Sequence, residues 1–292
     1  GVTLYANTSA RVLDWDGRKV TAVRAEVLDD ATRKPTGVKV VVKAKVTVVS
    51  GGAINSPGLL MRSQLLSEGR VGEKTWFHPV TLMLGLFDHE VDGFRGAPQS
   101  VYSHHFIDRG PGKMGYFFEV PPVHPMLAST VITGDGAQTM ELMSKLRHAN
   151  VMIALHVDGL LPEEEGGTVR LRDGAHSRYS IKYELTETHW EAFRSSSKEM
   201  AKLQFAAGAK EVRSLHLSPV TMKSAAEIDK LDAAPWEPVR LKLAAAVCGS
   251  NGSATAVLKS WVRSSRVARY RPVRPLAGSL RVKYSSRPSS PV

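Results

Sequence analysis

A valine-rich run that ends in two adjacent glycines constrains this chain most. Residues 38–49 place valine at alternating positions, as a half-buried strand does. Gly51-Gly52 then form a turn, and Pro57, with Asn55 or Ser56 as the cap, favours the start of a helix. Glycines allow close approach of a ligand, and a helix N-terminus attracts anions. The turn is therefore predicted either to join two packed elements or to hold a group such as a pyrophosphate.

The remaining patterns predict a mixed α/β protein. A helix is expected over Thr188–Ala207, with capping-box spacing between Thr188 and Glu191 and with Gly208 after its last turn. Its apolar face is expected to contain Trp190, Phe193, Met200 and Leu203. A second, short helix is expected from Ser224 onward. Strands are expected over 3–6, 20–28, 80–87, 166–172 and 178–185, with Asp173-Gly174 as the turn between the last two.

The positive charge is confined to one end of the chain. The net charge is +11, and eleven of the 39 Lys and Arg residues follow Glu237, the last acidic residue. The rest of the chain is therefore balanced, and no nucleic-acid partner is expected for it. Residues 243–292 combine this charge with many serines and prolines, which predicts a disordered basic tail. Two origins stay open: a frame-shifted or mis-spliced product, or a basic arm for acidic lipid or nucleic acid.

Cysteine content and hydropathy exclude some classes of protein. Cys248 is the single cysteine, so neither an intramolecular disulfide nor a cysteine-based zinc site is available. This favours a reducing, intracellular compartment. No apolar run approaches the roughly 20 residues of a membrane-spanning helix, so no transmembrane segment is expected. His104 and His105 are adjacent and would point to opposite faces of a strand, so no metal site is predicted.

One segment carries a family resemblance. The run Val48–Ser63, VVSGGAINSPGLLMRS, resembles the second signature of the glucose–methanol–choline (GMC) oxidoreductases. Val71-Gly72 and His78-Pro79 follow at the spacing of that family, and the preceding strands resemble its strand pair. The matching positions of the signature are Gly52, Ala53, Ser56, Pro57, Leu59 and Leu60. The resemblance extends more loosely over Gly1–Leu243.

The resemblance implies an α/β fold and FAD as cofactor. Residues 1–80 would form part of a Rossmann-like FAD-binding domain, and residues 81–242 a substrate domain with an antiparallel sheet and flanking helices. The reaction implied is oxidation of an alcohol, with hydride transfer to the flavin and release of an aldehyde or ketone. The cofactor-binding residues implied are Val12, whose backbone would meet the adenine, and Gly52, Ala53, Ser56 and His78.

The substrate side is implied by Gly115–Pro125, GYFFEVPPVHP. This stretch resembles family members that act on long-chain or other lipophilic alcohols. Tyr116, Phe118 and His124 are the predicted substrate residues. Plain packing is the alternative for each of them, and also for His78, because aromatic residues on a strand commonly belong to a core.

Two elements of the family pattern are missing from the chain. The family's amino-terminal Gly-x-Gly-x-x-Gly fingerprint does not precede the strand pair, and no histidine follows His216, so no catalytic residue is assigned. A fragment of an FAD-dependent alcohol oxidase or dehydrogenase is therefore the first hypothesis. A non-catalytic remnant or binding module of the same fold is the second, and a polyanion binder driven by the tail is the third.

Overall fold

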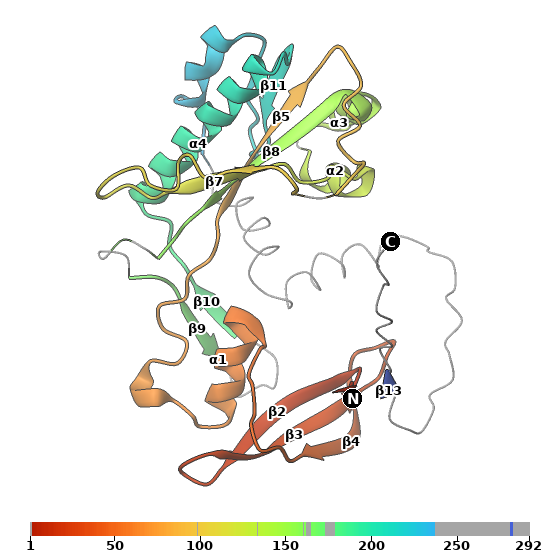
Figure 1. Cartoon of the computed structure of the whole chain (residues 1–292), viewed down its shortest axis with the longest axis vertical. Coiled ribbons are helices and arrows are strands. Elements are labelled where there is room, and N and C mark those ends of the chain that lie inside the picture. The colour runs from red at the N-terminus through yellow and green to blue at the C-terminus, as the bar shows by residue number, and fades with distance from the viewer. Residues whose placement is uncertain are drawn as a thin grey trace, which may run out of the picture. The chain divides into compact units, whose positions relative to one another are not determined.

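The computed structural model describes residues 2–97, 99–132, 134–159, 161, 165–172, 179–236 and 281–282. These residues divide into two compact units (Figure 1). Unit 1 comprises residues 2–71, 170–172, 179 and 281–282, and unit 2 comprises the described residues of 72–169 and 180–236. The predicted tail, 243–292, lies outside the described residues except for the two of β13 (Arg281–Val282), which pair with β1 (Val2–Thr3).

Unit 1 is built on a three-stranded antiparallel sheet. Its order is β2-β3-β4, with β2 at Thr8–Trp15, β3 at Val20–Leu28 and β4 at Pro35–Val42. The bounds of β3 confirm the predicted strand. Helix α1 (Gly52–Arg62) packs against β2, and a short 3-10 turn, η1 (Ser67–Gly69), follows it.

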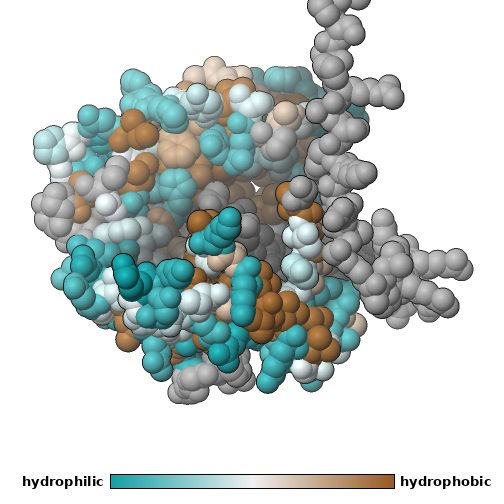
Figure 2. Space-filling view, turned by 60° about the horizontal axis from the view of Figure 1, so that its bottom comes forward, coloured by the Kyte–Doolittle hydropathy of each residue, from teal (hydrophilic) through white to brown (hydrophobic). Residues whose placement is uncertain are grey.

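The strand–turn–helix prediction was right in kind but wrong in its bounds. The strand ends at Val42, and Val46 and Val48 beyond it are 76% and 79% exposed. Figure 2 is turned so that the bottom of Figure 1 comes forward, and hydrophobic residues lie at the surface of that face. Helix α1 begins at Gly52, so Pro57 lies inside it rather than at its start. The reason is the positive φ of Gly52, 76°, which lets the chain enter the helix directly from the glycine pair.

Unit 2 is built on a six-stranded antiparallel sheet with helices on both faces. The strand order is β12-β11-β5-β8-β7-β6. Helix α4 (Glu187–Ala206) covers one face, and α2 (Pro125–Val131) with α3 (Gly136–Ser144) packs on the other (Figure 1). The strands are β5 (Val80–Leu86), β6 (Tyr102–Ser103), β7 (Tyr116–Glu119), β8 (Ala149–His156), β11 (Glu211–Ser214) and β12 (Thr221–Met222).

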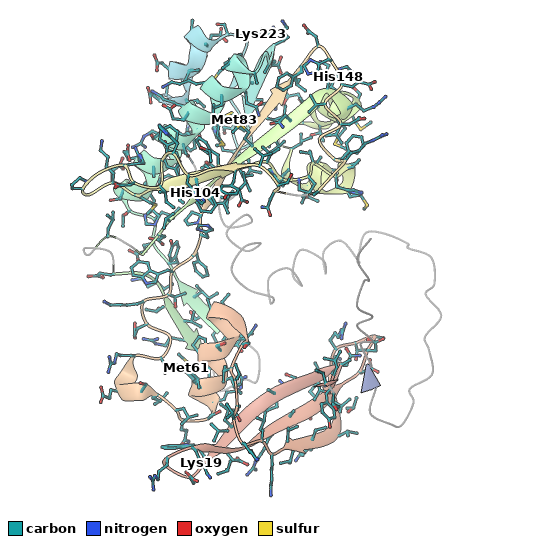
Figure 3. The ribbon with its side chains drawn as sticks, viewed as in Figure 1. Lys19, Met61, Met83, His104, His148 and Lys223 are labelled. Carbon is teal, nitrogen blue, oxygen red and sulfur yellow. The ribbon has the colours of Figure 1, made fainter. Side chains whose placement is uncertain are left out.

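Successive side chains along the strands point to opposite faces of the sheet and contribute to two hydrophobic cores. On β5, Met83 (Figure 3) joins the core under α4. Its neighbour Leu84 joins the core under α2 and α3. Both side chains are almost fully buried. This confirms the predicted strand at 80–87, which is apolar on both faces because both faces are covered. The paired strands predicted around residue 173 are also present, as β9 (Thr168–Leu171) and β10 (Tyr179–Lys182), while the turn itself lies outside the described residues.

The long helix confirms most of its prediction. Its cap is Thr186 with His189 at the third helical position, two residues before the predicted pair Thr188 and Glu191, which has the same spacing. Gly208 follows the helix with a φ of 101° and donates its N–H to the Phe205 carbonyl at 2.9 Å. Leu203 is 45% exposed, so its predicted place on the buried face was wrong. The short helix after Ser224 is η3 (Ala225–Leu231), and η2 (Leu146–His148) precedes β8. The fold is therefore mixed α/β with antiparallel sheets, as predicted.

Candidate functional site

A cavity of about 380 Å³ opens beside the first turns of α1 in unit 1. Strands β2 and β3 supply an apolar wall with Ala10, Leu13 and Val23. The glycine bend and α1 supply polar groups, among them Asn55 and Ser56. The other lining residues are Ser9, Thr47, Val48, Val49, Ser50, Gly51, Leu59, Arg62 and Tyr179. One wall therefore suits a flat apolar ring, and the other offers hydrogen-bonding groups to a sugar or phosphate.

The end of α1 is tied to strand β2 by two neighbouring side chains. Ser63 accepts a hydrogen bond from the Leu13 amide at 2.8 Å and donates to the Leu59 carbonyl at 2.7 Å. Arg62 donates through Nε to the Arg11 carbonyl at 2.9 Å. These bonds fix the helix at the distance from the sheet that leaves the cavity open. Both residues stand in the signature run, yet sequence reasoning gave them no role.

Tyr179 closes the cavity on a third side. Its ring lies against Gly58, where an added Cβ would come within 2.2 Å of the ring carbon Cε1. Its hydroxyl accepts a hydrogen bond from Nη1 of Arg62 at 3.1 Å. Gly58 is thus required by close packing rather than by its backbone conformation. No local sequence signal predicts this contact, because the two residues are far apart along the chain.

The electrostatics of the helix start favour an anionic ligand. The N-cap position is Gly51, which has no side chain to satisfy the first amides, and the first turn contains no acidic residue. These amides carry the positive end of the helix dipole. Arg62 adds a cationic side chain to the cavity wall. A pyrophosphate or ribose hydroxyl can therefore be accommodated here without competition from a carboxylate of the helix.

Of the predicted cofactor residues in unit 1, Ser56 lines the cavity directly. Gly52 and Ala53 form the first turn of α1, immediately after the lining residue Gly51. Val12 lies on β2 between lining residues, next to an irregularity in the β2–β3 register. The structure thus brings these four positions to one cavity or its border, and their cofactor role stays a prediction.

The fifth predicted cofactor residue, His78, belongs to unit 2. Its Nδ1 lies 2.8 Å from the His156 carbonyl oxygen, so this nitrogen carries the ring proton and Nε2 is the acceptor. Its ring packs near Phe117, with centroids 5.5 Å apart. His104 contacts the other edge of Phe117 at 5.4 Å. Phe117 is therefore at the centre of an aromatic group on the sheet face opposite α4.

Two predicted substrate residues, Tyr116 and Phe118, lie in the core under α4, with 0% and 2% exposure. The Tyr116 hydroxyl lies 3.0 Å from Oγ of Ser195, and Arg109 lies over its ring at 5.0 Å. Burial raises the pKa of Tyr116. This placement is what the packing alternative predicts, because residues 116 and 118 share one face of the strand and residue 117 has the other.

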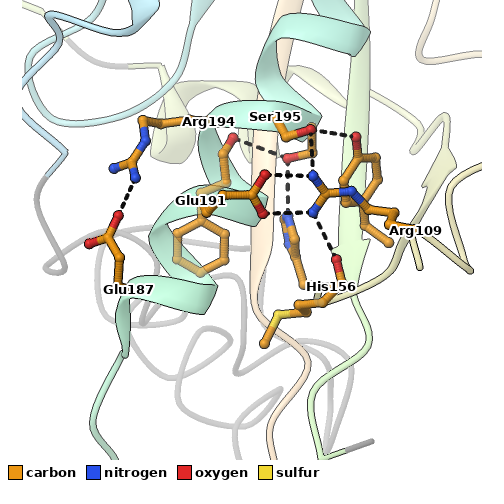
Figure 4. A network of polar contacts seen from close by, with 10 residues as sticks. Arg109, His156, Glu187, Glu191, Arg194 and Ser195 are labelled. Atoms are coloured by element: carbon orange, nitrogen blue, oxygen red, sulfur yellow. Dashed lines mark hydrogen bonds and ion pairs between the residues drawn. The ribbon is translucent and has the colours of Figure 1, made fainter. Parts of the chain in front are cut away.

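An ion pair fastens the segment before β7 to helix α4 (Figure 4). Arg109 donates to both carboxylate oxygens of Glu191, at 2.9 and 2.7 Å, and to Oγ of Ser195 at 3.0 Å. The hydrogen bond from Arg109 lowers the pKa of Glu191. His124, the third predicted substrate residue, is exposed and stands at the N-cap of α2. Its role stays a prediction.

A buried polar cluster in unit 2 was not predicted. The Asp158 carboxylate accepts hydrogen bonds from Tyr183 and from the Gly159 amide, and lies 3.5 Å from Nε2 of His189. Nδ1 of His189 accepts from the Thr186 amide at 3.1 Å, so Nε2 carries a proton and can donate to the carboxylate. Burial favours a higher pKa for Asp158, but the hydrogen bonds from His189 and Tyr183 outweigh it and lower that pKa.

His156 forms a second buried connection between the sheet and α4. Nδ1 lies 3.0 Å from the Pro79 carbonyl, and Nε2 lies 3.0 Å from Oγ of Ser196, which also contacts Thr81. Burial lowers the pKa of His156 to about 4. Nε2 therefore ties the sheet to α4, and Nδ1 ties β8 to the residue before β5.

Two other kinds of site are absent from the part of the chain that the structure describes. The described residues contain no group of three or more metal-ligating side chains placed to hold an ion. None of their helices combines the length and the apolar character needed to cross a bilayer.

Comparison with known proteins defines the class. Residues 2–80 match the family model described as GMC oxidoreductase. An uncharacterised GMC-type oxidoreductase of Mycobacterium tuberculosis is 30% identical over 204 residues, 70% of this chain and 30% of the relative. A long-chain-alcohol oxidase of Arabidopsis thaliana is 26% identical over 215 residues, 68% of this chain and 28% of the relative. The chain belongs to the GMC oxidoreductase family.

The chain spans about 30% of the length of these curated relatives. Among solved structures, pyridoxine 4-oxidase from Mesorbium loti matches 77% of this chain and 43% of its own, with 20% identity and a TM-score of 0.45. FAD-dependent oxidation of alcohols is the general chemistry of the family.

Proposed function

We propose that this chain is part of an FAD-dependent alcohol oxidoreductase whose unit 1 holds the adenosine end of FAD. The observation that supports the proposal is the position of the glycine bend at the wall of the cavity beside α1. Had the bend merely joined two packed elements, no cavity would be needed there. The polar and apolar walls match the two halves of adenosine, a flat base and a ribose with hydroxyls.

Individual residues have distinct tasks in this proposal. The backbone amides of Gly52 and Ala53 donate to the phosphate side, and the Ser56 hydroxyl offers a further hydrogen bond. The main chain at Val12 contacts the adenine edge. FAD, when bound, supplies the acceptor for the hydride that leaves the alcohol carbon. The share of unit 1 is to bind and orient the cofactor.

Unit 2 carries the residues proposed for the alcohol. The relation to a long-chain-alcohol oxidase supports a lipophilic substrate. On β7 we assign the substrate contact to Phe117, because Tyr116 and Phe118 face the core under α4. His78 shares the face of Phe117 and offers Nε2 as a hydrogen-bond acceptor. His124 remains a proposed contact on the strength of its sequence alone.

Binding of ADP, measured by calorimetry on the whole chain, tests the cofactor proposal. Wild-type protein should bind ADP, and Gly52→Ala should weaken binding about ten-fold or more, because a Cβ at positive φ costs roughly 1–2 kcal/mol and displaces the amides. Gly17→Ala is the matched control, since Gly17 also has a positive φ, 92°, in unit 1 but lines no part of the cavity.

Two outcomes would contradict the proposal. One is a folded wild-type chain that does not bind ADP at millimolar concentration. The other is an equal loss of binding in Gly52→Ala and Gly17→Ala. Alcohol oxidation by the FAD-loaded chain separates the enzyme from the remnant alternative, because a remnant binds the nucleotide and gives no product with any alcohol.

A further inference from the structure

A second cavity, of about 600 Å³, lies at the β11–β12 end of the sheet in unit 2. Arg213 of β11 and Thr221 of β12 form its floor, and Gln138 of α3 and Lys230 of η3 contribute from two sides. The remaining lining residues are Ser218, Pro219, Val220, Ala233, Ala234 and Pro235. None of the residues assigned to the cofactor or the alcohol lines it, so the proposed function leaves this cavity without a role.

The charge of this lining is one-sided. Arg213 and Lys230 are cationic, and the described lining residues include no Asp or Glu. Arg213 is 8% exposed, so its charge lies in a partly desolvated position where electrostatic attraction is strong. Its Nη2 donates to Oε1 of Gln138 at 3.4 Å. The hydroxyls of Ser218 and Thr221 add further donors.

The nearby carboxylates do not line the cavity, although Glu227 pairs with Lys230 and Glu141 interacts electrostatically with Arg213. Glu227 lies 2.8 Å from Nζ of Lys230 and also accepts the Lys223 amide at 2.8 Å. Glu141, on α3, lies 2.6 Å from Nζ of Lys145. Lys230 is 54% exposed and keeps donor capacity beyond Glu227, because an ammonium group has three protons.

We infer that this cavity binds a small organic carboxylate. The carboxylate would lie between Arg213 and Lys230, with Gln138 and Thr221 as further hydrogen-bond donors. An inorganic ion would leave most of the volume unfilled and the apolar wall of Pro219, Val220 and Ala234 uncovered. An apolar body attached to the anion covers that wall. The site is independent of the cofactor cavity and of the alcohol.

Benzoate is the test ligand, and benzamide is its neutral counterpart of the same shape. Binding to the whole chain is followed by the fluorescence of Trp236, which comes directly after the lining residue Pro235 and stacks on His216 at 4.9 Å. Ionic strength is held constant with chloride. We expect saturable binding of benzoate with a dissociation constant on the order of 1 mM, and binding of benzamide weaker by about ten-fold. Equal binding of the two ligands, or no binding of benzoate, overturns the inference.

Lys230→Gln and Lys202→Gln form a matched pair of variants. Each lysine is exposed on a helix and pairs with a glutamate three residues before it, Glu227 at 2.8 Å and Glu199 at 2.7 Å. Lys230→Gln should weaken benzoate about five-fold, and Lys202→Gln should leave it unchanged. An equal effect of the two substitutions would show that benzoate responds only to the net charge of the protein, and it would contradict the proposed site.

A third variant fills the cavity without altering its charge. Ala234→Leu should abolish benzoate binding, and because Ala234 is only half-buried the chain should still fold. Retained binding in this variant overturns the location. ADP binding should stay unchanged throughout, so failure here and failure of the proposed function are distinguishable. If inorganic phosphate competed as well as benzoate, the apolar body of the ligand would contribute nothing to binding, and the assignment to an organic carboxylate would be wrong.

Discussion

The polar side chains of unit 1 and of unit 2 are used in opposite ways. In unit 1, Asn55, Ser56 and Arg62 border a cavity, and the groups with most to offer are backbone amides. In unit 2, Asp158 and His156 are buried and satisfied by the groups that α4 and the sheet bring to them. The ionisable residues that would attract a search for catalysis are thus committed to packing. A pattern of His, Asp and Tyr says little about chemistry until the partners of each atom are known.

The largest expected effect breaks the interior of unit 2. Asp158→Ala removes one carboxylate that interacts with the Tyr183 hydroxyl, with His189 and with the Gly159 amide. A hydrogen bond to a charged group contributes roughly 1.5–3 kcal/mol, so the loss of several at once should lower the free energy of unfolding by about 4 kcal/mol. Urea unfolding measures it, and hydrogen exchange should place the loosening at the N-terminal half of α4.

Asp232→Ala is the control for this variant. Asp232 is 55% exposed and pairs with Lys198 at the surface, so its removal should change stability by less than about 1 kcal/mol. Unchanged ADP binding in both variants would support the separation of tasks between the units. A lasting loss of ADP binding in a folded Asp158→Ala protein would contradict it.

The next effect depends on pH and comes from His156. Its pKa in the folded state is about 4, below the 6.5 that is usual for a histidine in an unfolded chain, so the unfolded chain takes up the proton first as the pH falls. The stabilisation is complete above pH 6.5 and is lost as the pH falls to 4, by up to about 3 kcal/mol. His156→Gln lacks the titrating group, and its stability should decline less over the same interval. Parallel pH profiles would show that other groups cause the loss.

Sequence reasoning predicted the parts of the fold in which local pattern and tertiary structure agree. Strand β3 and strand β5 follow from hydrophobic spacing, and the end of α4 follows from Gly208. The start of α1 was misplaced because proline and cap preferences favoured Pro57, whereas a left-handed Gly52 begins the helix. The pattern of β7 could not show which face α4 covers, so it could not decide between packing and substrate contact for Tyr116 and Phe118.

Contacts between distant residues had no signal at all. Arg109, in the segment before β7, meets Glu191 of helix α4, and Tyr179 of strand β10 meets Gly58 of helix α1. Each residue type is common at a surface, and only the fold makes the pairs. The glycine bend, by contrast, was identified from its residues and from the family resemblance, and it lies beside a cavity.

The smallest expected effect concerns the wall of the cavity in unit 1. Gly58→Ala places a Cβ 2.2 Å from the Tyr179 ring, which should cost about 2 kcal/mol and move both Tyr179 and its partner Arg62. ADP binding should weaken together with stability, because both displaced side chains line the cavity. The control is Gly136→Ala in α3, where an added Cβ meets nothing within 4 Å and should be neutral or slightly stabilising.

In the double variant Gly58→Ala/Tyr179→Ala the clash is removed, so its cost should be less than the sum of the two single changes. Additive costs would show that the two residues do not touch and that the cavity has a different wall.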